Sequence, residues 1–358
     1  MEALVMDVAE AFSCIGWTVK LYPVFHYDPS IVFPNIEIIR RPLRNRVLRY
    51  FRERWFWKWC ALLAVFRHTS LNTPILYGHV HLLTFDSHIK YFRKGPRWVW
   101  TFGIDVWGER AKIWCSYLNR LDHIVSISKY TADRMVEEGV VVPISVIPCC
   151  TDINTFVPTT IPKYIRRNEI LICGRMSLQE SYKGHEVLFN ALPIAEKILG
   201  KQLAIRVVGT GDNVERLQSV VKTMGISDRV IFTGRIQQQE LIEAFQHCGV
   251  FCMPSRVDRN STGFWTGEGF GIVYVEAAAC GRPVIASCEG GAIETVVPGE
   301  TGLLVDPRSP QDVAEALAKI LGSLDLADKM GMAGRVLVEK QFSREVFVEN
   351  IKRLVLDA

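Results

Sequence analysis

Residues 267–287 read GEGFGIVYVEAAACGRPVIAS, and this stretch indicates the fold. A glycine turn holding Glu268 leads into an apolar segment with helical spacing that carries Glu276. The run RPVIAS that follows is typical of a buried strand, as is VFCMPS at residues 250–255 upstream. Strand, helix and strand in this order form the repeating unit of a parallel sheet covered by helices.

The same alternation continues on both sides of this stretch. The apolar runs are WTVKLYP, TPILYG, RWVWTFG, HIVSIS and ISVIPC in the first half, and EILICGR, LAIRVVGTG, RVIFTGR and TGLLV in the second. A chain of 358 residues is long enough for two domains. We predict an α/β protein with two Rossmann-like, doubly wound domains that face each other across a cleft.

The domain limits follow from the linker-like composition of residues 156–169, which contain prolines and charges. We expect an N-terminal domain over residues 1–158, a second domain over 159–342 and a last helix over 343–358 that packs on either domain. A doubly wound domain normally opens with a strand and a glycine-rich turn. Here Met1 sits directly at the helical run EALVMDVAEAFSCIG, so we expect that opening strand and loop to be missing.

Charge and cysteine usage restrict the class of protein. Residues 1–160 hold 19 Lys/Arg and 14 Asp/Glu (+5), and the remainder holds 23 and 24 (−1), which together give the net +4. The ten cysteines include no CxxC pair, so reduced thiols and a cytoplasmic location are expected. No apolar run reaches the roughly 20 residues that a membrane-spanning helix needs. No nucleic-acid-binding module is present, so we expect no nucleic-acid partner.

The basic excess is concentrated in RRPLRNRVLRYFRERWFWKWCALLAVFRH, residues 40–68, where a run of arginines is followed by Trp55, Trp57 and Trp59. Basic residues beside interfacial aromatics are typical of a helix on an anionic membrane surface, which would bring the protein to a lipid-linked acceptor as a peripheral protein of the inner face. A solvated basic helix with its aromatics in the domain core explains the same pattern. Both interpretations remain open.

The glycine turn predicts a ligand site. Ligands of α/β sheets bind beyond the carboxyl ends of strands, where helix N-termini offer free N–H groups to anions. The backbone of Phe270, Gly271 and Ile272 would meet a phosphate, and Gly269 and Gly271 permit its close approach. Glu276 would accept the hydroxyls of a ribose and Glu268 those of a second sugar. The pattern suits a nucleotide sugar; a loop with one solvated and one cap-stabilising glutamate is the alternative.

Two cations upstream strengthen the first interpretation. Arg175 ends the run EILICGR, just past the expected strand end, and Lys183 stands at the start of a helical segment. A diphosphate is bound well by one planar bidentate donor and one compact cation. No DxD-like acidic pair lies nearby, so these side chains would neutralise a leaving diphosphate without a metal. Taken singly, each is an ordinary surface charge.

These segments resemble the donor domain of retaining family-4 glycosyltransferases, the glycosyl transferases group 1, which have the GT-B fold. The matching motifs are GRM…YKGHEVLFNAL, VVGTGDNVERL, VIFTGR and EGFGIVYVEAAACGRPVIAS…GGAIETVVPGETGLLVDP. The resemblance covers nearly all of residues 165–342, and its specific part is the Glu-x7-Glu pair of Glu268 and Glu276. The first half resembles the family more loosely, through VMDVAEAFSCIGWTVKLYP, TFGIDVWGERAKIW, DHIVSISKYTADRM and VIPCCTDINTF.

The resemblance implies a metal-independent, retaining transfer of a sugar from a UDP- or GDP-linked donor to a glycan or lipid-linked acceptor, with no cofactor. Glu268, Arg175 and Lys183 would be the catalytic residues. The remaining implied positions contact the donor or lie on the acceptor side. Donor-binding positions would be Glu276, Gly269, Phe270, Gly271, Ile272, Gly209, Gly211, Gly234, Arg235 and Ile236, and acceptor-side positions Gly103, Asp105 and Ser128.

Two departures from the family pattern leave alternatives. Phe102 stands where many members have a histidine, and we expect the N-terminal glycine loop to be missing. A nucleotide-sugar-binding GT-B subunit without catalysis is therefore one alternative, and a nucleotide-sugar epimerase is another. His79 and His81 would point to one face of a strand, as half of a metal site or as buried, hydrogen-bonded histidines. Ser128 is equally well explained as a helix N-cap.

Overall fold

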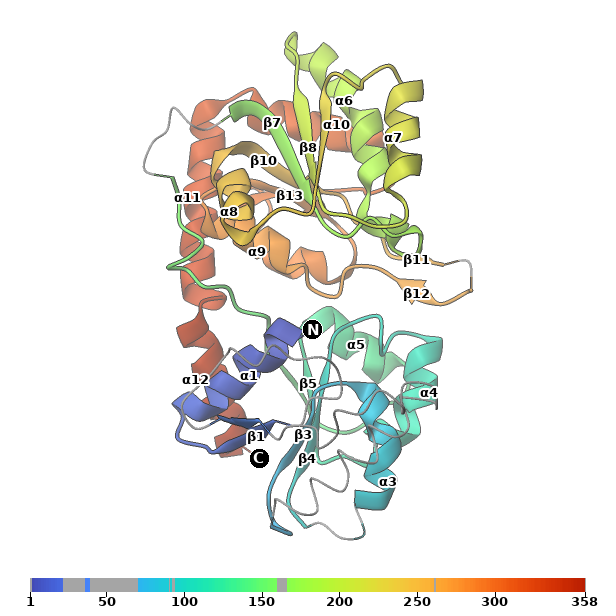
Figure 1. Ribbon diagram of the computed structural model, residues 1–358, viewed down its shortest axis with the longest axis vertical. Coiled ribbons are helices and arrows are strands. Elements are labelled where there is room, and N and C mark those ends of the chain that lie inside the picture. The colour runs from blue at the N-terminus through green and yellow to red at the C-terminus, as the bar shows by residue number, and fades with distance from the viewer. Residues whose placement is uncertain are drawn as a thin grey trace, which may run out of the picture.

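The computed structural model describes residues 2–21, 36–38, 70–89, 91, 94–159, 166–260 and 262–357. These residues form two α/β lobes, one above the other in Figure 1. The basic segment 40–68 lies outside the described residues. Within the described part of the chain, no helix is both long and apolar enough to cross a bilayer.

The second lobe is built on a six-stranded sheet in the order β14-β13-β10-β7-β8-β9, with every pairing parallel. Counted along the chain, this is the 3-2-1-4-5-6 order of a doubly wound sheet, whose order reverses between β7 and β10. The strands are β7 (Arg166–Cys173), β8 (Ala204–Val208), β9 (Val230–Gly234), β10 (Cys248–Met253), β13 (Val284–Ser287) and β14 (Gly302–Val305). Strand β7 occupies the end of the expected linker, 156–169.

Helices cover both faces of this sheet (Figure 1). They are α6 (His185–Leu199), α7 (Val214–Thr223), α8 (Gln238–His247), α9 (Ile272–Ala279), α10 (Pro310–Leu321) and α11 (Leu324–Gln341), with the short turns η4 (Leu178–Lys183) and η5 (Gly290–Thr295). Their apolar sides form the core with the strands. Strands β10 and β13 are buried along their whole length, which explains why they read as continuous apolar runs, whereas the edge strand β9 exposes Ile231.

The first lobe contains a four-stranded parallel sheet in the order β3-β4-β5-β6 and a separate parallel pair, β1-β2. Its strands are β1 (Val19–Leu21), β2 (Ile36–Ile38), β3 (Ile75–Tyr77), β4 (Arg97–Thr101), β5 (His123–Ser126) and β6 (Ile144–Val146). Its helices are α1 (Glu2–Cys14), η2 (Val80–Phe85), α3 (Asp86–Ile89), α4 (Glu109–Leu118) and α5 (Lys129–Glu137). Gly16 follows the end of α1 with φ +91°, the left-handed conformation in which a glycine commonly stops a helix.

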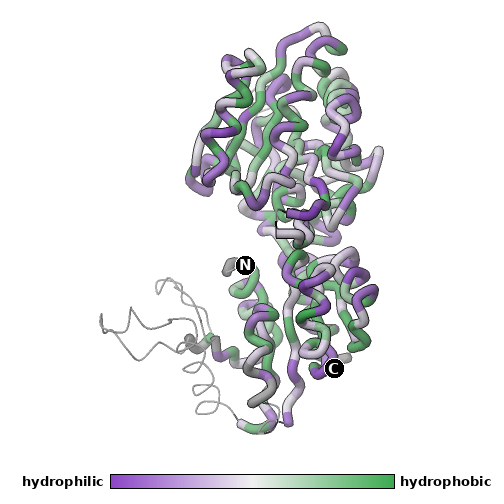
Figure 2. The backbone as a smooth tube through the Cα atoms, turned by 90° about the vertical axis from the view of Figure 1, so that its right-hand side faces the viewer, coloured by the Kyte–Doolittle hydropathy of each residue, from purple (hydrophilic) through white to green (hydrophobic). Residues whose placement is uncertain are grey.

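The C-terminal helix α12 (Arg344–Asp357) returns to the first lobe, where it lies beside α1 (Figure 1). The ring of Phe347 packs 5.9 Å from that of Trp100 in β4. Arg344 forms ion pairs with Asp7 at 3.0 Å and Glu10 at 2.9 Å, both in α1. Apolar side chains of α1, β4 and α12 join the core of the second lobe. In the side view of Figure 2 the backbone is narrower between the two lobes than within either of them.

Candidate functional site

The second lobe places a lysine–glutamate ion pair where its strand order reverses. Lys183, at the end of η4, donates to the Glu268 carboxylate at 3.1 Å, and only 12% and 17% of the two side chains are exposed. Burial, the largest single cause, lowers the pKa of Lys183, but the charge and hydrogen bond of Glu268, acting together with Tyr182 and Glu180, raise this pKa above its ordinary value. Gly174, after β7, makes room for the pair, because a Cβ there would come within 2.9 Å of the lysine Cδ. The site therefore keeps a charged ammonium ion.

Helix α9 begins beside this pair with no side chain capping it. Its N-cap, Gly271, has φ +89°, and a Cβ at this position would overlap the Tyr274 ring, so the position requires glycine. The first-turn N–H groups are those expected from the sequence to meet a phosphate. The Phe270 side chain is buried against Phe342, with ring centroids 5.6 Å apart, so only its backbone is available to a ligand.

Glu276 lies in α9, half-buried, and its carboxylate makes no hydrogen bond or ion pair with any residue that the structure describes. Burial raises its pKa to about 7. Its charge also raises the pKa of the Cys173 thiol at the end of β7, after burial itself, which places Glu276 at the strand end beside Lys183. A desolvated carboxylate without a partner is an acceptor that a ligand hydroxyl can satisfy.

Because burial raises the pKa of the Glu276 carboxylate, the stability of the folded protein should depend on pH. The Glu276 pKa is about 7, against an ordinary 4.5, so the folded state binds the extra proton between these values. The protein therefore loses stability as pH rises through this window. Glu276→Gln, which does not titrate, is expected to melt at a higher temperature than wild type at pH 8, with the difference disappearing near pH 4.5. Melting curves across this range check it, with exposed Glu300→Gln as the matched control; a constant difference at every pH contradicts it.

Two tyrosines that the sequence did not single out complete this part of the site. The Tyr182 ring lies 5.2 Å from the Lys183 Nζ, and burial, followed by the charge of Glu268, raises the Tyr182 pKa above its ordinary value. The Tyr274 hydroxyl donates to the Met253 carbonyl at 2.7 Å at the end of β10. The position of Tyr182 directly before Lys183 could have indicated that Tyr182 belongs to the site. No local sequence pattern indicates Tyr274.

Arg175 is not in contact with the Lys183–Glu268 pair. Its side chain is 71% exposed and forms an ion pair with Glu180 in η4. The charges of Glu180 and Arg175 nevertheless act on the Tyr182 pKa, so both lie near the buried pair. The sequence located Arg175 correctly beyond β7 but did not reveal the glutamate that holds it.

The glycines expected to line the site are explained by backbone packing. A Cβ on Gly209, which has φ +133°, would overlap the Gly174 carbonyl, and one on Gly211 would overlap the Met176 carbonyl. The Gly209 N–H donates to the Gly234 carbonyl at 2.9 Å, joining the ends of β8 and β9. Beyond Gly234, Arg235 is exposed with no described partner, and Ile236 packs on the core.

The first lobe contributes the turn after β4. The Asp105 carboxylate accepts the Phe102 N–H at 3.0 Å, and burial raises the Asp105 pKa to about 6 despite this bond. Gly103 has φ +118°, and a Cβ there would lie 2.8 Å from the Gly269 Cα. A Cβ on Gly269 would in turn overlap the Phe102 carbonyl. The turn at residues 102–105, which the sequence predicted to lie on the acceptor side, therefore touches the Glu268 loop.

Two expectations for the first lobe need correction. Ser128 is fully buried, accepts the Thr131 N–H at 3.1 Å and donates to the Thr131 hydroxyl at 2.9 Å, so it is the N-cap of α5 and does not face a ligand. His79 and His81 do not lie on a strand, because β3 ends at Tyr77 and both belong to η2 or its cap.

The two imidazoles stack on each other at the carboxyl edge of this sheet. Their ring centroids are 4.7 Å apart, and His79 also stacks on Phe102 at 6.0 Å. Burial, and then the neighbouring His81, lowers the His79 pKa to about 4, so His79 is neutral at physiological pH. Among the described side chains, no group of three potential ligands could hold a metal ion.

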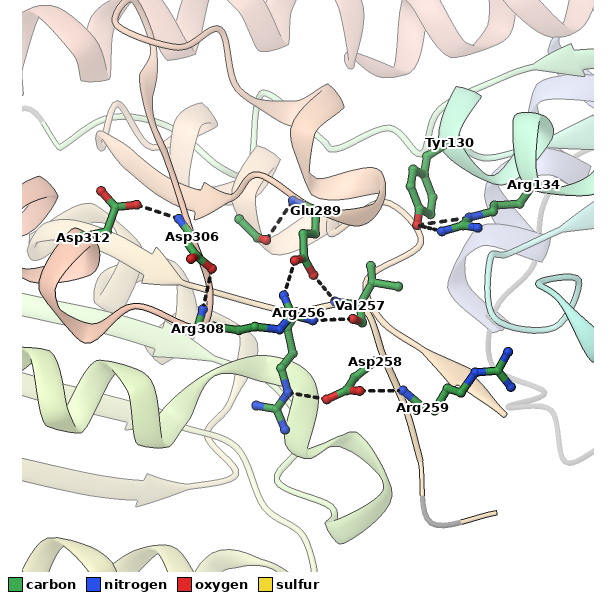
Figure 3. Close-up of polar contacts among 11 residues, drawn as sticks. Tyr130, Arg134, Arg256, Val257, Asp258, Arg259, Glu289, Asp306, Arg308 and Asp312 are labelled. Carbon is green, nitrogen blue, oxygen red and sulfur yellow. Dashed lines mark hydrogen bonds and ion pairs between the residues drawn. The ribbon is translucent and has the colours of Figure 1, made fainter. Parts of the chain in front are cut away.

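A hairpin of β11 (Asp258–Arg259) and β12 (Trp265–Thr266) extends from the second lobe to the first. The Val257 N–H donates to Glu289 at 2.7 Å, and Arg308, which pairs with Glu289, donates to the Val257 carbonyl at 2.8 Å (Figure 3). At the hairpin's other end, Arg110 of α4 donates to the Trp265 carbonyl at 3.0 Å. The sequence did not predict this connection.

Comparison with known sequences supports the assignment of the second lobe. Residues 160–337 match the family described as Glycosyl transferases group 1. The chain is 35% identical over 253 residues to a GDP-mannose-dependent alpha-(1-6)-phosphatidylinositol monomannoside mannosyltransferase of Mycobacterium tuberculosis (strain ATCC 25618 / H37Rv), covering 68% of this chain and 64% of that protein. The chain is also 31% identical over 249 residues to a GDP-mannose-dependent monoacylated alpha-(1-6)-phosphatidylinositol monomannoside mannosyltransferase of Corynebacterium glutamicum. This match covers 66% of this chain and 62% of that protein. The matches thus span less than two thirds of these relatives.

Solved structures support the fold of the whole chain. Sucrose-phosphate synthase from Thermosynechococcus elongatus superposes with a TM-score of 0.78 at 23% identity, over 99% of this chain and 92% of that one. A glycosyltransferase from Rickettsia africae gives 0.72 at 19% identity, over 99% and 93%. The chain therefore has the GT-B fold and belongs to the family of glycosyl transferases group 1.

Proposed function

We propose that the protein transfers a hexose from a nucleotide-diphosphate sugar to a glycolipid acceptor, with retention of the anomeric configuration and without a metal. One observation carries the proposal. The Lys183–Glu268 ion pair and Glu276, which has no partner within the described part of the chain, lie beside the N-terminus of α9, where the strand order reverses. A donor with hydroxyls at both ends and phosphates between them matches this arrangement of two carboxylates around a cation and a helix N-terminus.

The same groups suit the chemistry of the transfer. As the bond between the anomeric carbon and the diphosphate oxygen breaks, negative charge grows on the diphosphate and positive charge on the sugar. Lys183 and the first-turn N–H groups of α9 would stabilise the diphosphate, and Arg175 would join them by exchanging Glu180 for phosphate. Once phosphate engages Lys183, the Glu268 carboxylate is free to accept a sugar hydroxyl.

The relatives favour one donor and one class of acceptor. The mycobacterial and corynebacterial proteins are named for GDP-mannose as donor and for phosphatidylinositol mannosides as acceptors. We take GDP-mannose as the first candidate donor, with UDP-sugars as the alternative, and a lipid-linked acceptor on the inner membrane face. The basic segment 40–68 would be the membrane contact of a peripheral protein, and a solvated basic helix with its aromatics in the core is the alternative.

Calorimetry with GDP-mannose and UDP-glucose tests the donor site. We expect one of the two to bind, and Glu276→Ala to weaken that binding at least about tenfold, since it removes two hydrogen bonds to a carboxylate. Binding that is unchanged in Glu276→Ala would show that the ribose lies elsewhere. Turnover with a phosphatidylinositol mannoside, measured with and without EDTA, tests metal independence, and the anomeric proton coupling in the product tests retention.

A second candidate is supported by Phe102. This side chain has no titratable group, and it stacks on a neutral His79 at the acceptor edge. A protein that binds the nucleotide sugar without transferring it would be consistent with this feature. Such a protein would bind the donor with the same dependence on Glu276 but would release no nucleotide when acceptor is added.

A further inference from the structure

The N-terminus of α5 is completed by a residue of the other lobe. Ser128 caps this helix from within the first lobe by accepting the Thr131 N–H. The preceding N–H groups, of Lys129 and Tyr130, have no partner in their own helix. Both donate at 2.8 Å to the two carboxylate oxygens of Glu294, which lies in η5 of the second lobe.

This contact suits its position electrostatically. A carboxylate at a helix N-terminus is attracted by the positive end of the helix dipole, and hydrogen bonds to a charged group are about twice as strong as neutral ones. The Lys129 ammonium is paired with Asp133 at 2.6 Å. Glu294 therefore binds the backbone N–H groups of α5 and not the Lys129 side chain. The contact is therefore set by the arrangement of the lobes.

The turn that carries Glu294 also supports the proposed catalytic loop. The Gly291 N–H donates to the Glu268 carbonyl at 2.8 Å, and a Cβ on Gly290 would lie 2.8 Å from the same oxygen. A Cβ on Gly291 would overlap the Gly269 carbonyl. Because η5 packs directly on the Glu268 loop, the bond from Glu294 to α5 fixes where that loop lies relative to the first lobe.

We propose that Glu294 is a positioning residue, which holds the two lobes in the arrangement that brings Glu268 to the acceptor side. The proposal rests on the proposed transferase function for its kinetic consequences but not for its structural ones. Glu294 touches neither Lys183 nor Glu276, so it acts on the relative position of the lobes and leaves the donor site itself intact.

Glu294→Ala, Glu294→Gln and the control Glu300→Gln test this in the full-length protein. Small-angle X-ray scattering without ligand is expected to give a larger radius of gyration for Glu294→Ala than for wild type, with Glu300→Gln unchanged. In transfer assays, kcat should fall about tenfold or more in Glu294→Ala, because charged hydrogen bonds between the lobes are lost. The nucleotide Kd should stay within about twofold, and Glu294→Gln, which keeps one acceptor oxygen, should recover part of kcat.

The outcomes separate this proposal from the proposed function. An unchanged radius of gyration in Glu294→Ala overturns the positioning role, whether or not the protein is an active transferase. A Kd that weakens as much as kcat falls also overturns it, because the residue would then act on donor binding. Wild type that binds no nucleotide sugar overturns the proposed function, and the scattering comparison still decides the role of Glu294.

Discussion

Replacing Lys183 by alanine is expected to abolish most of the transfer activity and to destabilise the protein. The change removes the cation from a largely buried ion pair and leaves the Glu268 carboxylate without compensation. Breaking such a pair from one side typically costs about 3 kcal/mol of unfolding free energy. Loss of one preorganised donor to a leaving group costs about a hundredfold in kcat or more.

Denaturant unfolding and steady-state kinetics on the same preparations measure both effects. The double change Lys183→Met with Glu268→Gln should restore most of the stability, because no charge is then buried alone, but not the activity. The control is Lys329→Ala, which removes an exposed lysine paired with Asp325 and should change the unfolding free energy by no more than about 0.5 kcal/mol. A stable, inactive Lys183→Ala protein would mean that Glu268 is far better solvated than its surroundings indicate.

Gly269→Ala should stop transfer while leaving the donor site able to bind. The added methyl group would overlap the Phe102 carbonyl and lie 3.2 Å from the Gly103 Cα, both in the other lobe. The lobes must separate to accommodate it, and a misplacement of about 1 Å between reacting groups can cost a hundredfold in rate. The sequence placed Gly269 among the donor-binding positions, but the nearest atoms to a Cβ there all belong to Phe102 and Gly103 of the first lobe. Nucleotide binding through Lys183 and Glu276 should therefore change by less than about threefold.

Calorimetry and turnover assays distinguish this from simple unfolding. A protein that binds nucleotide with wild-type affinity, melts normally and turns over at least about a hundredfold more slowly matches the expectation. Gly78→Ala is the matched control, because its methyl group would meet only the Val5 Cγ2, at the ordinary distance of 3.4 Å. Normal turnover in Gly269→Ala would show that the contact between the Phe102 and Gly269 backbones is not needed for transfer.

The order of elements was predictable because it is a local property. Apolar runs of strand length, helical spacing between them and glycines at helix ends are all readable within a few residues, and β3 to β10, β13, β14, α1, α9 and α12 lie where these patterns placed them. The hairpin β11–β12 was missed because strands of two residues carry no periodic signal.

The site was predictable as a set of positions but not as a set of interactions. Glu268, Glu276, Arg175 and Lys183 were identified from residue type and from their place beyond strand ends. Only the tertiary structure decided that Lys183 pairs with Glu268, that Glu276 has no partner among the described residues and that Arg175 pairs with Glu180. Each choice depends on which side chains approach through space, and the sequence separation of Lys183 and Glu268 is 85 residues.

The sequence alone therefore determined the α/β alternation, the glycine turn before α9 and the chemical types gathered around it, because these depend on short-range preferences of the backbone and of side-chain burial. The tertiary structure decided the direction of each side chain and the meeting of the lobes. The buried Ser128 side chain caps α5, and Glu294 accepts the Lys129 N–H at the same helix end although the two residues are 165 positions apart in the sequence. Such contacts arise from the packing of whole elements, and no local pattern along the chain records them.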